Sequence, residues 1–105
     1  LHENGEVFFI FKYSLTMQCF VYILYSKAFD KFYVGQTKDV KARLLRHNSG
    51  TEKFTAPFAP WIIMLTLSKP SRSEAVILER KLKNLSKIRL REFIQKYAQA
   101  ETTPP

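Results

Sequence analysis

Two short runs of β-branched and aromatic residues stand close together in the chain, and they constrain its fold more than any other feature. The first run covers residues 20–25 and the second residues 32–35, with a polar turn at 26–31 between them. These residue types favour strands, and two strands joined this closely form a hairpin. A third, nearly continuous apolar run at residues 61–67 predicts another strand. Its apolar character indicates a central strand that is covered on both faces.

Helical patterns fill the intervals between these runs. Thr37 or Asp39 stands where a residue can cap a helix, and Gly50 is a stop signal for that helix. The intervening residues include Val40 and Leu44 at helical spacing. We therefore expect a first helix between the hairpin and the third strand.

Two further helices are predicted after the third strand. Ser71 and Glu74 stand in capping-box register ahead of an apolar stripe, and Ser86 can cap a last helix over residues 87 to about 99. The order is β-β-α-β-α-α. It predicts an α/β (α+β) fold with a small three-stranded sheet, mixed or antiparallel, flanked by helices.

Size and charge bound the class of protein. The chain has 105 residues, which suits one domain, and its net charge of +8 indicates an anionic partner, nucleic acid ahead of membrane lipid. Its one cysteine, Cys19, makes no internal disulfide, which fits a reducing compartment, and we expect the cytoplasm. We expect the domain to span residues 17–99. Residues 1–16 are interpreted as an extension, without fixed structure or forming an added strand, and residues 100–105 as a frayed tail.

Most familiar enzyme sites are absent from the sequence. One cysteine and two histidines (His2 and His47) are too few for a structural zinc site. Three glycines in total exclude a G-x-G-x-x-G fingerprint, and neither a Walker loop nor a G-x-S-x-G elbow is present. The remaining candidates are polar side chains at positions where the pattern calls for apolar ones.

Glu79 is the sharpest of these candidates. On a helical wheel it falls about 40° from Ala75 and about 60° from Leu82, inside the apolar stripe of its helix. A carboxylate buried there needs a charged partner or a metal ion. The simpler interpretation is an ordinary surface pair with Lys83, which stands four residues further on.

Two other pairs carry the same ambiguity. Arg43 and His47 lie four residues apart on one helical face, where they can bind a phosphate or be ordinary boundary residues. Tyr22 and Tyr33 lie on opposite arms of the hairpin, where aromatic residues are usually part of a core.

Basic residues gather on one side of the helices that follow the third strand. They project within an arc of roughly 60–140° on the helical wheel, next to Glu79. The arc consists of Arg72, Arg80, Lys83 and Lys87. A basic arc beside a half-buried carboxylate favours a track for a polyanion over a merely solvated face.

Taken in order, these residues resemble the GIY-YIG nuclease superfamily, and in particular its small single-domain bacterial members, which are similar to the nicking domain of excinucleases. The likeness extends over about residues 17–97. It is carried by Tyr22 within the run 20–24, Tyr33-Val34-Gly35, Arg43, His47 and Glu79. Three positions depart from the family pattern: Phe20 replaces the first glycine of the name motif, Val34 replaces isoleucine in its second half, and Gln36 stands where some relatives have a lysine.

The resemblance implies an endonuclease that hydrolyses the phosphodiester bonds of DNA with low sequence specificity, in DNA repair or processing. Glu79 would hold one divalent ion, Mg²⁺ or Mn²⁺. Tyr22 would orient or deprotonate the attacking water with support from Tyr33, Arg43 would neutralise charge on the phosphate, and His47 would assist proton transfer.

The basic arc, together with Gly35 and Gln36, would contact the nucleic acid. RNA as the substrate, and a protein partner that supplies targeting, are left open. Two alternatives come from other classes of protein: an inert nucleic-acid-binding module that retains the fold, and an adaptor that uses its basic face against an acidic protein.

Overall fold

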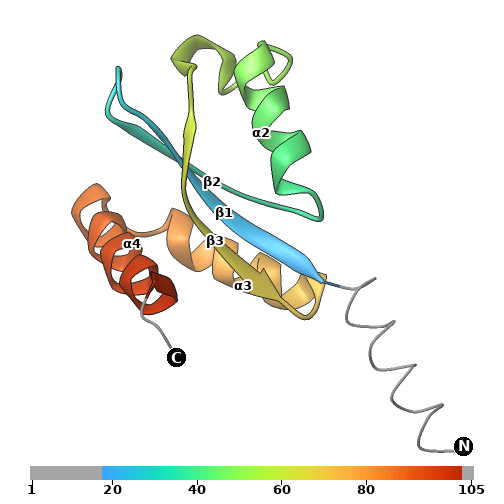
Figure 1. Ribbon diagram of the computed structural model, residues 1–105, viewed down its shortest axis with the longest axis vertical. Coiled ribbons are helices and arrows are strands. Elements are labelled where there is room, and N and C mark those ends of the chain that lie inside the picture. The colour runs from blue at the N-terminus through green and yellow to red at the C-terminus, as the bar shows by residue number, and fades with distance from the viewer. Residues whose placement is uncertain (1–17, 103–105) are drawn as a thin grey trace, which may run out of the picture.

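The computed structural model describes residues 18–102, in which a three-stranded sheet stands between two layers of helix (Figure 1). The order β-β-α-β-α-α and the α+β class are confirmed. The expectation for residues 1–16 lies outside the described residues. The elements are β1 (Cys19–Ser26), β2 (Lys31–Thr37), α2 (Val40–Ser49), the 3-10 helix η1 (Ala56–Phe58), β3 (Ile62–Lys69), α3 (Arg72–Lys83) and α4 (Lys87–Thr102). The last helix thus continues three residues beyond its predicted end.

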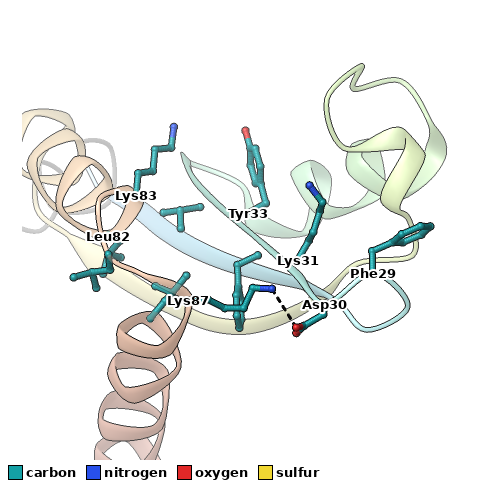
Figure 2. Close-up of a pocket in the computed structure, with 11 residues that line it drawn as sticks. Phe29, Asp30, Lys31, Tyr33, Leu82, Lys83 and Lys87 are labelled. Carbon is teal, nitrogen blue, oxygen red and sulfur yellow. Dashed lines mark hydrogen bonds and ion pairs between the residues drawn. The ribbon is translucent and has the colours of Figure 1, made fainter.

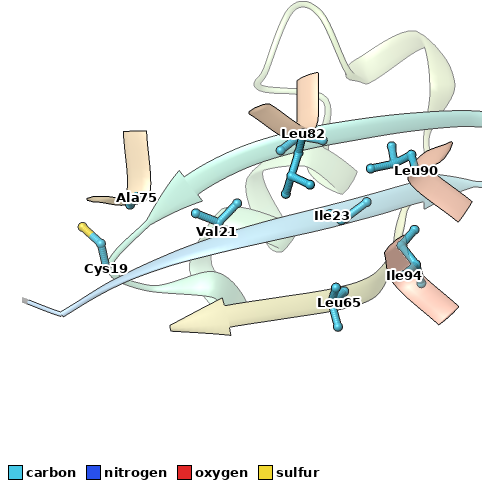
Figure 3. Close-up of a cluster of buried hydrophobic side chains, with 9 residues drawn as sticks. Cys19, Val21, Ile23, Leu65, Ala75, Leu82, Leu90 and Ile94 are labelled. Atoms are coloured by element: carbon cyan, nitrogen blue, oxygen red, sulfur yellow. The ribbon is translucent and has the colours of Figure 1, made fainter. Parts of the chain in front are cut away.

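The sheet is entirely antiparallel, with the strand order β2-β1-β3. Alternate residues of β1 point to opposite faces, and both faces are covered. Val21 and Ile23 join a core with α3 and α4, part of which Figure 3 shows. Tyr22 and Leu24 pack on the other face with side chains from α2 and η1. The strand of the hairpin that comes first in the chain is therefore the buried centre of the molecule.

The prediction that residues 61–67 form a central strand is wrong, because β3 lies at an edge of the sheet. Ile62 is 53% exposed and Met64 36% exposed, whereas Leu65 is buried. The pairing with β1 is irregular here: Ile23 pairs with Leu65 and Leu24 with Ile63, which leaves Met64 out of register. Bulges of this kind are common at sheet edges. An apolar run shows that a segment can be buried, but the topology decides which strand is.

The predicted start and end of α2 and the predicted start of α3 are confirmed. Asp39 caps α2, where its side chain accepts a hydrogen bond from the backbone N–H of Ala42 at 3.0 Å. Gly50 follows α2 at φ 86°, a left-handed conformation that glycine adopts without strain. Ser71 caps α3 by accepting from the backbone N–H of Glu74 at 3.2 Å. These caps fix where α2 and α3 begin, and hence which of their side chains reach the sheet.

The turn of the hairpin is tied to α4 through Asp30. Its carboxylate accepts a hydrogen bond from the Tyr25 hydroxyl at 2.7 Å and forms ion pairs with Lys87, at 3.1 Å, and with Arg91. These contacts lower the pKa of Asp30, the hydrogen bond from Tyr25 most of all. Among the described residues, none of the helices combines the length and apolar character needed to cross a membrane.

Candidate active site

Tyr22 lies at the middle of the central strand with its ring packed over Gly35. The two residues are directly paired across β1 and β2, and the tyrosine side chain is only 1% exposed. A Cβ atom at position 35 would come within 2.5 Å of the Tyr22 hydroxyl oxygen and 2.7 Å of Cζ. Because no real Cβ is tolerated that close, glycine at position 35 is what lets the phenol lie in this position.

A chain of polar groups leads from the Tyr22 hydroxyl into the protein. The hydroxyl lies 3.0 Å from Nε2 of His47, and Nδ1 of His47 lies 2.7 Å from the hydroxyl of Thr55. The Thr55 hydroxyl donates to the backbone carbonyl of Glu52 at 3.5 Å. It therefore accepts from Nδ1–H, which leaves Nε2 free to accept the proton that Tyr22 donates.

Burial sets the protonation states of this pair. It raises the pKa of Tyr22 to about 12, and Tyr33 acts in the same direction, while the guanidinium of Arg43 opposes the shift. Burial also lowers the pKa of His47, as do Arg43 and Arg46, against the opposing charge of Glu52. Near neutral pH, Tyr22 is therefore a phenol and His47 a neutral imidazole, as the hydrogen bond between them requires.

Tyr33 and Arg43 complete this cluster on the face of the sheet that α2 covers. The ring of Tyr33 lies 4.8 Å from that of His47 and 6.3 Å from that of Tyr22, measured between centroids. Arg43 is half-buried one turn before His47 on α2. The structure thus brings together Tyr22, Tyr33, Arg43 and His47, four of the residues that the resemblance assigned to one site.

Glu79 projects from α3, on the other face of the sheet, and contacts the strand β2. One carboxylate oxygen accepts a hydrogen bond from the Gln36 side chain at 3.2 Å, and the other pairs with Lys83 at 3.1 Å. The ion pair is the one that the simpler interpretation expected. However, the carboxylate is only 16% exposed and is also bound to β2. Gly35 contacts Tyr22 and its neighbour Gln36 contacts Glu79, so the two halves of the site meet at consecutive residues of one edge strand.

The predicted basic arc is divided by the fold. Arg72 and Arg80 are exposed on α3, and Lys83 lies against Glu79. Lys87, in contrast, is held in its ion pair with Asp30 at the hairpin turn. Three of the four cations therefore stay on the helix that carries Glu79, whereas the fourth joins α4 to the hairpin.

Sequence reasoning missed the residues that hold His47 in place. Thr55 is buried and contacts the imidazole, and its carbonyl accepts a hydrogen bond from the Trp61 indole at 2.9 Å. Asn48 binds the backbone of Trp61 at both its N–H, 2.6 Å away, and its carbonyl, 3.0 Å away. These residues stand in or beside an irregular loop, where no periodicity signals a contact. The only sequence signals were the bulky tryptophan and the polar residues around it.

The chain is similar in sequence and in fold to known proteins. The family model described as the GIY-YIG catalytic domain matches residues 18–97. The UPF0213 protein BH0048 of Halalkalibacterium halodurans is 34% identical over 79 residues, which cover 74% of this chain and 83% of that protein. The solution NMR structure of that protein, under the organism name Bacillus halodurans, superposes with a TM-score of 0.50 over 75% of this chain and 84% of the other.

The chain belongs to the GIY-YIG family. The match runs from the start of β1 into α4, and it includes Tyr22, Tyr33 and Glu79. The family is one of nucleases, and the small UPF0213 protein is a single-domain member of it.

Proposed function

We propose that the protein is a metal-dependent endonuclease that hydrolyses phosphodiester bonds of DNA with low sequence specificity, in DNA repair or processing. One observation carries this proposal: Tyr22 with its partner His47, and the carboxylate Glu79, meet at consecutive residues of β2. Each of these contacts has an ordinary explanation by itself. Their convergence on Gly35 and Gln36 is what favours one site with one function.

The donor set suits a divalent ion held by a single carboxylate. Mg²⁺ is usually bound through one or two carboxylates together with water and substrate phosphates. Among the described residues, no group of three or more acidic, histidine or cysteine side chains is assembled for a metal, and Glu79 is the carboxylate at the site. Bound there, Mg²⁺ or Mn²⁺ would polarise the scissile phosphate and stabilise the leaving oxygen.

The protein's own residues supply the proton path. With a pKa of about 12, Tyr22 is not ionised near neutral pH, so it cannot act as a base while it keeps its proton. It can take a proton from the attacking water as it passes its own to Nε2 of His47, which lies 3.0 Å away and is neutral. In this proposal Arg43 neutralises charge that develops on the phosphate, and Tyr33 supports the water by hydrogen bonding.

A plasmid-nicking assay tests this function. Supercoiled plasmid is incubated with the protein and Mn²⁺ or Mg²⁺, and with EDTA as the metal-free control. We expect metal-dependent conversion to the open circle, and a loss of about 10²-fold or more in rate for Tyr22→Phe and for Glu79→Gln. Matched controls are Tyr97→Phe, an exposed tyrosine of α4, and Glu74→Gln, on the same helix as Glu79. Both should nick at the wild-type rate.

Each outcome bears on a different part of the proposal. Nicking that persists at the wild-type rate in Glu79→Gln would contradict the assigned site. Tight binding of DNA without nicking by the wild-type protein would favour the inert nucleic-acid-binding module.

We also propose the cytoplasm as the compartment, because the single cysteine, Cys19, is buried and unpaired.

A further inference from the structure

A groove runs along the outer edge of β2, beside the candidate active site (Figure 2). Its volume is about 520 Å³, and it lies between the hairpin turn and β2 on one side and the end of α3 and the start of α4 on the other. Volumes of this size accommodate small-molecule ligands or parts of larger ones. Tyr33 belongs both to this groove and to the active-site cluster, so the two are continuous.

The lysines that line the groove differ in whether they form ion pairs within the protein. Lys83 is paired with Glu79, and Lys87 with Asp30. Lys31 forms no ion pair with any described residue, and its ammonium lies 4.4 Å from the centre of the Phe58 ring. Figure 2 shows that the side chains of Lys31, Tyr33 and Lys83 point to the same side of the groove, with Tyr33 between the two lysines. An anion that contacts Tyr33 therefore has Lys31 within reach.

An exposed aromatic side chain stands at the end of this row. Phe29 lines the groove and is 51% exposed. Its ring meets that of Phe58 edge to face, with centroids 5.3 Å apart and an angle of 82° between the planes. This contact restrains the ring and leaves much of its surface open. A restrained, exposed aromatic ring beside an available lysine is the arrangement on which nucleic-acid bases stack while their phosphates are neutralised.

The spacing of the row fits a nucleic-acid strand. Lys31 and Tyr33 are two residues apart on one face of β2, which corresponds to about 6.8 Å. Phosphates in one strand of a duplex advance by about 3.4 Å along the helix axis. Neighbouring phosphates also rotate about that axis, so the distance between them is longer than this advance. A strand lying along β2 with its scissile phosphate at Tyr33 would therefore present the adjacent phosphate to Lys31.

We propose that this groove binds the nucleotide next to the scissile phosphate, with Lys31 on its phosphate and the ring of Phe29 against its base. The inference rests on the proposed function, which it extends by giving the path of the bound strand from Tyr33 past Lys31 toward Phe29. Lys31 and Phe29 are thus substrate-binding residues outside the predicted set.

The test is the salt dependence of DNA binding. Fluorescence anisotropy with a labelled single-stranded 12-mer, in EDTA and between about 50 and 200 mM salt, gives the slope of log K against log salt concentration. Each phosphate contact contributes about 0.7 to that slope for a single strand. We expect Lys31→Gln to reduce the slope by about that amount. The matched control Lys27→Gln alters an exposed lysine of the same hairpin outside the groove, and it should leave the slope unchanged.

Phe29→Ala tests the stacking contact separately. We expect affinity for the 12-mer to fall about five- to tenfold with little change in slope, because a base–aromatic contact is lost and no charge is removed. Tyr97→Ala is the control, since Tyr97 is an exposed aromatic residue with Lys96 beside it and lies outside this groove. Urea unfolding of each variant measures whether losing the contact to Phe58 also lowers the free energy of unfolding.

The results separate this inference from the proposed function. An unchanged slope for Lys31→Gln, or an unchanged affinity for Phe29→Ala, overturns the binding site for the flanking nucleotide even where the plasmid is nicked. A wild-type protein that binds the 12-mer with both expected effects but does not nick supports the groove and contradicts the nuclease. A wild-type protein that does not bind DNA overturns both.

Discussion

At the scale of single residues, the candidate site depends on one missing side chain. Gly35 has no Cβ, and the Tyr22 phenol occupies the space that a Cβ would fill. The sequence resemblance placed Gly35 among the residues that contact nucleic acid. In the structure its direct contact is with Tyr22, so it determines how that hydroxyl lies against His47.

Gly35→Ala should therefore impair both activity and stability. The new methyl group must displace the Tyr22 ring, and a shift of about 1 Å in a catalytic group can cost about 10²-fold in rate. Overpacking should lower the free energy of unfolding by about 1–3 kcal/mol. Plasmid nicking and urea denaturation measure the two effects. In a Tyr22→Ala background the substitution should cost little stability, and an equal cost in both backgrounds would contradict the proposed contact.

The buried imidazole of His47 should make the stability of the protein depend on pH. Burial holds the pKa of His47 below its usual value of about 6.5, so the unfolded chain takes up this proton more readily than the folded protein. The stability that the neutral ring contributes is fully present above about pH 6.5 and is lost as the pH falls through the lower folded-state pKa. Urea midpoints between pH 8 and 5 should fall for the wild type and change less for His47→Gln. Parallel curves for the two proteins would contradict this account.

At the scale of elements, the two edge strands have different properties. β2 carries the polar residues of the candidate site on its outer side, whereas β3 presents Ile62, Ile63 and Met64 to solvent. Helix caps and the hairpin could be read from the sequence because they depend on neighbouring residues, as Asp39 and Ser71 show. The position of β3 could not be read from the sequence. It depends on which edge of β1 stays free after β2 has paired with the opposite edge.

The edge position of β3 can be checked with a pair of substitutions. Ile62→Lys places a charge on an exposed edge, so it should change the free energy of unfolding by no more than about 0.5 kcal/mol. Leu65→Lys, three residues along the same strand, buries the charge and should cost more than about 3 kcal/mol or prevent folding. Urea denaturation compares them, and similar losses in both would contradict the edge position.

At the scale of the whole molecule, the sheet divides the candidate site between its two faces. Tyr22, Arg43 and His47 belong to the face that α2 covers, and Glu79 to the face that α3 covers. Both halves contact the edge strand β2 at consecutive residues, Tyr22 at Gly35 and Glu79 at Gln36. The net charge of +8 indicated an anionic partner. The fold leaves Lys31 available beside this edge, while Lys83 and Lys87 are held in ion pairs.

The sequence marks the residues of this candidate site as unusual, but it does not indicate their supporting contacts. Tyr22, Tyr33, Arg43, His47 and Glu79 are polar or aromatic residues at positions that periodicity marks as inward-facing. The contacts that orient them come from elsewhere. Thr55 lies in an irregular loop, and its hydrogen bond to His47 results from tertiary packing that no local spacing records.

The central claim is that Tyr22 and Glu79 act as one site across the edge of β2. The most direct measurement is the rate of metal-dependent nicking for Tyr22→Phe, Glu79→Gln and the double variant. Losses from residues that act as a unit are strongly non-additive, so we expect the double variant to nick no more slowly than the slower single variant. A double variant whose loss equals the product of the two single losses would contradict the account, and so would a wild-type rate in either single variant.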